Sequence, residues 1–179
     1  MQGLASPMLK IRLGYISYDF ANHPLAHLLQ SIFRMHDRSM FHVVCFSLRP
    51  NDNSEARRNI EKWSDEFIEV DPTLNSIELA SRINQKNIHI LWDLNGWTAG
   101  KRTDVFVLRP APIQIQFMGF CSSMGADYID YIVTDKIASP PNTLDRLYSE
   151  KVIYMPDSYF VNDYKQSCRF IFDNDRPTR

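Results

Sequence analysis

A polar loop near the amino terminus carries the residues that come closest to a catalytic set. Asp19, Asn22 and His23 lie close together in sequence, and His27 follows one helical turn later. A carboxylate beside a histidine can tune its basicity, and the start of a helix offers free N–H groups to an anion or a sugar hydroxyl. The same residues also fit a structural role, with Asn22 capping a helix, Asp19 in a turn and His27 on the helix face. Spacing alone does not decide between these interpretations.

Two further loops combine polar residues with glycine. Asp93–Arg102 (DLNGWTAGKR) offers an acid, an amide, a hydroxyl and two cations, but it lacks the GxGxxG and GxxxxGK patterns of nucleotide-phosphate loops. Gly119–Gly125 (GFCSSMG) has a glycine at each end, which permits close approach of the backbone to a ligand. A structural interpretation stays open here as well, with glycines that shape a turn and with Arg102 and Arg109 paired to carboxylates.

Strands and helices alternate along the segments that must position these loops. Leu9–Ser17 alternates apolar and polar residues, and Ile88–Leu94 is almost continuously apolar, as in a strand buried on both faces. This alternation predicts βαβ units and an α/β fold with a parallel sheet and flanking helices, followed by an irregular tail from Tyr159. The other expected strands are Phe41–Leu48, Phe67–Val70, Ala111–Met118, Tyr128–Thr134 and Lys151–Tyr154, and the expected helices are Leu25–His36, Glu55–Trp63 and Ser76–Gln85.

The strand ends tell where a ligand would bind. In an open α/β sheet, ligands lie outside the carboxyl ends of the strands. Three of the expected strands are followed by the loops Tyr18–Pro24, Asn95–Arg102 and Gly119–Gly125. We therefore expect these three loops to converge on one cleft.

Composition excludes several classes of protein. The chain has 179 residues, a length suited to one domain, and 44% of them are hydrophobic, which excludes a disordered chain. Its 20 Lys and Arg residues balance 21 Asp and Glu residues, which argues against a nucleic-acid partner. No apolar run is long enough to span a membrane.

Cysteine and histidine usage argues against a metal or disulfide framework. The three cysteines include no CxxC pair, which favours a reducing intracellular compartment. His36, His42 and His89 lie within or beside apolar runs, and no HxxxH or HExxH spacing occurs. We therefore expect no metal site.

Three stretches together resemble a known enzyme family. RLGYISYDFANHP, DLNGWTAGKRTDVFVLRPAPIQIQFMGF and YSEKVIYMPDSYF are similar to the protein O-GlcNAc transferases of glycosyltransferase family 41, which include the Spindly-type protein O-fucosyltransferases. The resemblance covers roughly Lys10 to Phe160. LRPAPIQ preceded by DLNGxT is its most specific part.

The resemblance implies an architecture and an activity. Residues 9–160 would form the Rossmann-like N-terminal lobe of a GT-B glycosyltransferase, with 1–8 as an extension and 161–179 as a connector toward a second lobe. The enzyme would transfer N-acetylglucosamine from UDP-GlcNAc to Ser or Thr of cytoplasmic or nuclear proteins, with inversion and without a metal cofactor. Its partners would be protein acceptors, the second lobe and tetratricopeptide repeats outside this chain, and neither nucleic acid nor membrane.

The resemblance also assigns site residues. Asp19 matches an aspartate that helps to carry the acceptor proton, and His23 matches a residue beside the donor phosphates and the acceptor backbone. These two are the expected catalytic residues. The expected substrate-binding residues are Asn22, Pro24, Thr98, Arg102, Met118 and Gly119.

Some positions depart from the family pattern. Leu25 stands where a hydroxyl residue is usual, Met118 replaces leucine, and GFCSSMG replaces GYPGTSG. A Spindly-like enzyme that uses GDP-fucose and a non-catalytic binding module are therefore kept as alternatives. We expect the chain alone to be inactive, because the basic residues that face the donor pyrophosphate belong to the second lobe in this family.

Overall fold

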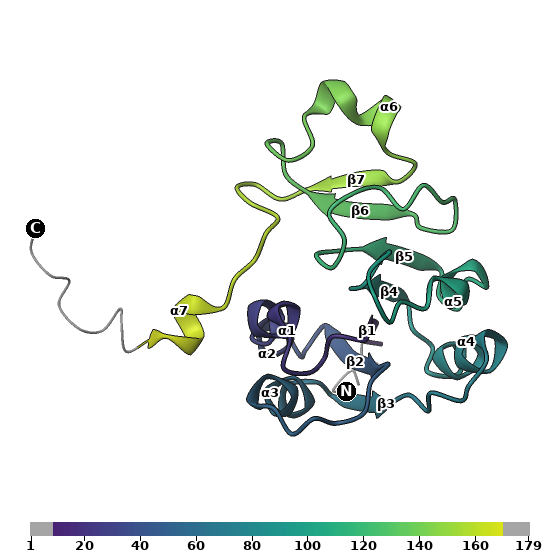
Figure 1. Ribbon diagram of the computed structural model, residues 1–179, viewed down its shortest axis with the longest axis vertical. Coiled ribbons are helices and arrows are strands. Elements are labelled where there is room, and N and C mark those ends of the chain that lie inside the picture. Colours follow the sequence, from purple (N-terminus) through teal and green to yellow (C-terminus); the bar gives the residue numbers. More distant parts are fainter. Residues whose placement is uncertain (1–8, 170–179) are drawn as a thin grey trace, which may run out of the picture.

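Seven strands pair side by side in one parallel sheet (Figure 1). The computed structural model describes residues 9–169, so the expected extension 1–8 and the end of the expected connector, 170–179, lie outside it. The strand order is β3-β2-β1-β4-β5-β6-β7, and every pair of neighbours runs parallel. The predicted α/β fold with a parallel sheet is confirmed.

The strands match the sequence predictions closely and are in general shorter than expected. They are β1 (Ile11–Ser17), β2 (Phe41–Ser47), β3 (Glu66–Glu69), β4 (Ile90–Asp93), β5 (Ile113–Gln116), β6 (Tyr131–Thr134) and β7 (Lys151–Tyr154). The helices are α1 (Pro24–Leu29), α2 (Ile32–Met35), α3 (Glu55–Trp63), α4 (Ser76–Gln85), α5 (Thr103–Val107), α6 (Leu144–Leu147) and α7 (Tyr164–Ser167), with a 3-10 turn η1 at Pro141–Thr143.

Helices cover both faces of the sheet. α1, α2 and α3 lie on one face, and α4 and α5 lie on the other (Figure 1). The strand alternation separates two cores, so that Leu13 and Tyr15 pack with the first group while Ile16 packs with the second. β1 is therefore a central strand with an apolar layer on each side, although in the sequence only one of its faces is regularly apolar.

The register brings the ends of three strands together. Ile16 of β1 pairs with Asp93 of β4, and Asp93 pairs with Gln116 of β5. The loops after β1, β4 and β5 therefore leave adjacent positions on the same edge of the sheet. The predicted convergence of these loops is confirmed.

The helix expected over Leu25–His36 is divided in two. Around Ser31 the hydrogen bonding tightens, with the Arg34 N–H donating to the Ser31 carbonyl at 3.2 Å, three positions back. The side chain of Gln30 accepts a hydrogen bond from Asn59 of α3 at 2.8 Å. Leu29 and Phe33 still reach the core, so the apolar stripe is kept although the helix is interrupted.

The helices α5, α6 and α7 were not expected from the sequence. α5 has five residues and the other two have four, which is too short for an apolar stripe to repeat. The tail after Tyr159 is therefore not wholly irregular. No helix within residues 9–169 combines the length and the apolar character needed to cross a lipid bilayer.

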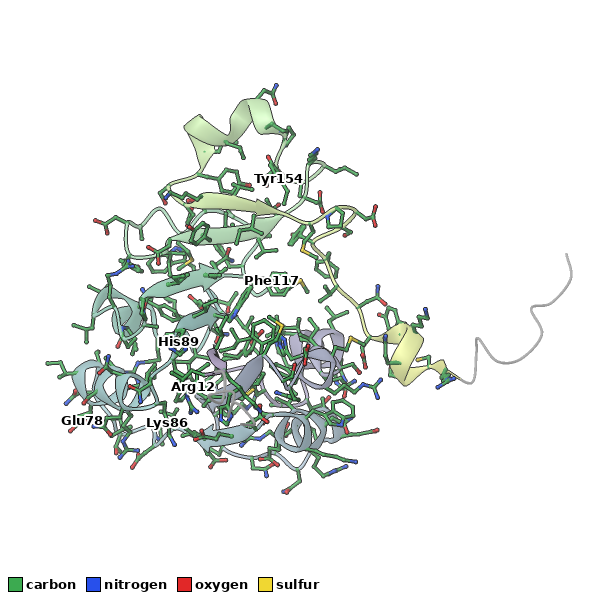
Figure 2. All side chains as sticks on the ribbon, turned by 180° about the vertical axis from the view of Figure 1, so that it is seen from behind. Arg12, Glu78, Lys86, His89, Phe117 and Tyr154 are labelled. Carbon is green, nitrogen blue, oxygen red and sulfur yellow. The ribbon has the colours of Figure 1, made fainter. Side chains whose placement is uncertain are left out.

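Ionic contacts hold the amino-terminal edge of the sheet. Glu66 binds Arg12 and Lys86, both at 2.6 Å, and His42 at 2.9 Å. The ring of His89 accepts the Arg12 N–H at 2.9 Å, and Figure 2 shows Arg12, Lys86 and His89 gathered in this region. Both histidines therefore bind neighbouring side chains or backbone within the fold.

Arg57 of α3 organises the opposite edge of the sheet. Its side chain is fully buried, and Nη1 donates to the Phe20 carbonyl at 3.1 Å and to Ser47 Oγ at 2.6 Å. Nη2 and Nε bind Glu69 at 2.9 Å and Glu61 at 3.0 Å. One guanidinium therefore joins the loop after β1 to the ends of β2 and β3.

We expect Arg57→Met to destabilise the fold by about 3 kcal/mol, because buried acceptors would lose their donor and two glutamates their cation. Thermal unfolding should show a fall in Tm of roughly 6–12 °C. Arg58→Met is the matched control, since Arg58 is an exposed neighbour on the same helix. Equal losses in the two variants would contradict the role assigned to Arg57.

Candidate functional site

Asp19 and His23 meet on the loop after β1. Asp19 is buried, and its backbone N–H donates to Ser17 Oγ at 3.0 Å. His23, not Asn22, caps helix α1, because its Nδ1 accepts the Leu25 N–H at 3.2 Å. The expectation of Asn22 as the cap is wrong. Nε2, the other ring nitrogen of His23, lies 3.8 Å from Asp19 Oδ1.

Asn95, directly after β4, connects the first two loops. Its side chain is buried, and Nδ2 donates to Asp19 Oδ2 at 2.8 Å and to Thr98 Oγ1 at 3.2 Å. Its Oδ1 accepts the Tyr18 N–H at 2.7 Å. Sequence reasoning placed Asn95 in the right loop but did not select it. The feature of the sequence that could have identified Asn95 is its amide side chain, placed just after a strand that is buried on both faces.

The electrostatic surroundings of Asp19 favour its protonated form more than water does. Burial raises the pKa of Asp19 above its ordinary value, while the charge of His23 and the hydrogen bond from Asn95 act in the opposite direction. One carboxylate oxygen is held by Asn95, and the other lies beyond hydrogen-bond distance of His23. Asp19 thus has an oxygen available to accept a proton.

A cavity of about 320 Å³ opens beside this pair. Five of the eight expected site residues line it, and they come from all three loops. The complete lining is Asp19, His23, Leu25, Leu28, Thr98, Ala99, Met118, Gly119 and Phe160.

Four lining residues were not among the expected site residues. Leu25 and Leu28 come from α1, and Ala99 comes from the second loop. Phe160 reaches the cavity from the segment after β7 and is 52% exposed. The tail was expected to be irregular, so the sequence pattern did not place Phe160 at the site. Phe160 does belong to the YMPDSYF stretch, which resembles the family.

Three expected site residues do not line this cavity. The side chain of Asn22 binds the His27 ring at 2.9 Å, and Pro24 is the first residue of α1. Arg102 binds Asp104 at 3.1 Å. The structural interpretation that paired Arg102 and Arg109 with carboxylates describes these contacts, since Arg109 binds Asp130 at 2.9 Å.

The backbone conformation of the loop after β5 is constrained by close contact with the neighbouring loop. Met118 has φ +66°, a left-handed conformation that is strained for a side chain of its type. A Cβ placed on Gly119 would lie 1.8 Å from the carbonyl oxygen of Leu94. Only glycine allows the third loop to pack this closely on the second.

Within residues 9–169, no three His, Cys, Asp or Glu side chains gather as metal ligands would. The three cysteines are free, with Cys45 buried and Cys121 exposed. The polar chemistry of the site therefore resides in the carboxylate, imidazole, amide and hydroxyl groups described above.

We expect Gly119→Ala to displace the third loop and to lower Tm by about 5–10 °C, since a methyl group cannot overlap a backbone carbonyl. Gly125→Ala is the control within the same loop: a Cβ there meets nothing within 4 Å, although φ is +63°. Its loss should be limited to about 1–2 kcal/mol of backbone strain. Thermal unfolding of both variants measures the difference, and a milder effect at Gly119 than at Gly125 would contradict the assigned contact.

The chain is similar to known glycosyltransferases along most of its length. It is 46% identical over 171 residues to the probable UDP-N-acetylglucosamine–peptide N-acetylglucosaminyltransferase SEC of Arabidopsis thaliana, covering 95% of this chain and 17% of that protein. It is 42% identical to the UDP-N-acetylglucosamine–peptide N-acetylglucosaminyltransferase of Caenorhabditis elegans, covering 92% and 14%. It is 28% identical to the Arabidopsis protein named SPINDLY, covering 87% and 17%.

Structural comparison agrees. A variant of the O-GlcNAc transferase of Thermobaculum terrenum superposes with a TM-score of 0.79 at 29% identity, covering 86% of this chain and 29% of that one. The chain thus spans less than a third of each of these proteins. The model of the family described as glycosyl transferase family 41 matches residues 2–175. A match over nearly the whole sequence, joined to the same fold, makes this chain a member of glycosyl transferase family 41.

Proposed function

We propose that this chain is the N-terminal lobe of the catalytic region of a protein O-GlcNAc transferase. The observation that carries the proposal is the placement of Asp19. Asn95 holds one of its oxygens at 2.8 Å, and Asp19 lines the cavity together with His23. Family membership and the similarity to two peptide N-acetylglucosaminyltransferases support the same conclusion.

In the proposed reaction, the hydroxyl oxygen of a Ser or Thr side chain attacks the anomeric carbon of the sugar with inversion. The bond from that carbon to the diphosphate breaks, and the nucleoside diphosphate leaves. The hydroxyl proton passes to Asp19, directly or through a water molecule. Because burial raises the pKa of Asp19, this carboxylate accepts a proton more readily than an exposed aspartate does.

The other residues would position the reactants. His23 presents its Nε2 side to Asp19 at 3.8 Å and would assist the acceptor hydroxyl, directly or through a water molecule. Met118 and the backbone of Gly119 would contact the sugar, with Thr98 on the neighbouring wall. We propose UDP-GlcNAc as the donor, with GDP-fucose as the alternative, because Leu25 and Met118 alter the cavity wall relative to the family pattern.

The diphosphate leaving group needs positive charge that this cavity does not supply. None of the nine lining residues is lysine or arginine. Developing negative charge on a leaving group is stabilised by cations or helix N-termini. We propose that a second lobe of a GT-B catalytic region supplies them, that tetratricopeptide repeats select protein acceptors, and that the protein acts in the cytoplasm or nucleus.

An assay of N-acetylglucosamine transfer tests whether a second lobe is needed for activity. The purified 179-residue chain should transfer no labelled N-acetylglucosamine to an acceptor peptide, whereas a longer protein that joins it to the remainder of a family catalytic region should do so. In the longer protein, UDP should compete with the donor and GDP should not. Transfer by the 179 residues alone, or competition by GDP in place of UDP, would overturn the corresponding part of the proposal.

In the same longer protein, Asp19→Asn should lower kcat by about 100-fold or more, because the amide cannot accept the proton. Asp127→Asn, at an exposed position outside the cavity, should retain the activity. An unchanged kcat in Asp19→Asn would exclude Asp19 as the proton acceptor.

A second candidate function rests on a different cavity. On the face that carries α1 and α2, a cavity of about 260 Å³ is lined almost wholly by apolar side chains, among them Leu29, Trp92, Phe117 and Val161. Such a surface favours association, as in a non-catalytic interaction module. Size-exclusion chromatography with and without a family second lobe tests this function: a shift to a complex supports it, and a monomer indifferent to the lobe counts against it.

A further inference from the structure

Two buried oxygens, on two residues that are paired across neighbouring strands, have no hydrogen-bond donor among the described residues. Asp93 ends β4 and Gln116 ends β5, and the two are directly paired in the sheet register. Their side chains therefore project from the same face. Oδ2 of Asp93 and Oε1 of Gln116 are both buried, and no described protein group donates to either. Buried acceptors without a donor are costly in a protein interior.

The remaining atoms of both side chains are already bound. Oδ1 of Asp93 accepts the N–H groups of Asn95 and Gly96, each at 2.9 Å. The amide nitrogen of Gln116 donates to the carbonyl of Phe120, which determines which end of this amide is oxygen. What the pair lacks is one proton.

Among residues 9–169, no cation acts on the pKa of Asp93. Burial raises the pKa of Asp93, and the two N–H groups of Gly96 and Asn95 only partly oppose this effect. Tyr128 is a titratable group near Asp93, and burial is the largest cause that raises the pKa of Tyr128. Oδ2 of Asp93 receives no hydrogen bond from the Tyr128 hydroxyl or from any other described group, so the phenol does not stabilise the ionised carboxyl.

We propose that Asp93 is a neutral carboxylic acid in the native protein, that it donates its Oδ2 proton to Oε1 of Gln116, and that this pair positions Asn95 toward Asp19. The hydroxyl of the acid supplies the missing donor, and both buried oxygens are then satisfied. Asp93 is thus a positioning residue, because it touches neither the cavity nor the reacting groups.

The connection to the site is a chain of three contacts. Asp93 Oδ1 fixes the turn at Asn95 and Gly96, and the same turn directs Asn95 Nδ2 at Asp19 Oδ2. Losing the turn would release the oxygen of Asp19 that the amide holds. That the orientation of Asp19 matters for transfer rests on the proposed function, whereas the protonation of Asp93 does not.

Asp135 provides a matched aspartate with the opposite surroundings. It follows β6 at the same edge and is also buried. Its Oδ1 accepts the N–H groups of Ile137 and Ala138, and its Oδ2 accepts that of Tyr159 at 3.0 Å. With donors on both oxygens, the backbone N–H groups of Ala138, Tyr159 and Ile137 hold the pKa of Asp135 below its ordinary value.

The first test compares Asp93→Asn, Asp93→Leu and Asp135→Asn in the 179-residue chain by thermal unfolding. Asparagine reproduces the neutral acid, with its Nδ2 donating to Gln116, so Asp93→Asn should unfold within about 2 °C of the parent below about pH 3.9 and at a higher temperature than the parent at pH 7, where only the parent must bind a proton to fold. Asp93→Leu leaves two N–H groups without an acceptor and should lose about 5–10 °C. A loss in Asp93→Asn as large as in Asp93→Leu would overturn the proposal.

The pH dependence of unfolding shows whether Asp93 is protonated or ionised, even if Asp93→Leu does not fold. With a raised native pKa, the stability of the parent relative to Asp93→Asn is highest below the ordinary value of about 3.9 and falls as pH rises through the native pKa. For Asp135→Asn the parent's advantage is instead present above the ordinary value and is lost as pH falls through the native pKa. A parent advantage over Asp93→Asn that grows with rising pH would mean that Asp93 is ionised.

Carboxyl NMR titration of Asp19 tests the positioning role. In Asp93→Leu the midpoint for Asp19 should rise by about one pH unit, because Asn95 no longer stabilises the carboxylate, while in Asp93→Asn it should not move. An unmoved Asp19 in Asp93→Leu would overturn the positioning role and leave the protonation of Asp93 intact. None of these measurements uses transferase activity, so they stand or fall separately from the proposed function.

Discussion

The burial of the Arg57 guanidinium is the constraint on which the carboxyl edge of the sheet depends. A buried cation with five N–H donors must find acceptors and negative charge, and few arrangements supply both. Here the carbonyls of Phe20 and Arg49 and the carboxylates of Glu61 and Glu69 meet this requirement. The loops after β1 and β2 are therefore held together. Asp19 is next to Phe20 in the first of these loops, so its position is fixed as well.

The sequence was most informative where local signals agree with the fold. Helices α3 and α4 begin and end as predicted, because each combines an apolar stripe with a capping residue, Ser54 or Asn75. The strand-end rule located all three site loops, since parallel strands carry their carboxyl ends to one edge. The resemblance to the family named Asp19, His23, Thr98, Met118 and Gly119 as site residues, and the structure brings these five together in one cavity.

What the sequence could not predict depends on contacts between distant segments. Asn95 is central only because its amide reaches Asp19, 76 positions away. The burial of Arg57 depends on tertiary packing. A charged residue on an amphipathic helix is normally exposed, so the sequence does not predict this burial. Arg102 was expected in the cleft but binds Asp104, its neighbour at the start of a helix too short to leave a periodic pattern.

The close approach of Gly119 to the Leu94 carbonyl has a consequence for how this site can diversify. Because backbone packs on backbone there, the path of the third loop is set without help from the side chain of Met118. Met118 itself faces the cavity from that fixed path. A change at position 118 therefore alters the cavity wall and the core that Met118 packs in, while the contact between the Gly119 and Leu94 backbones is kept.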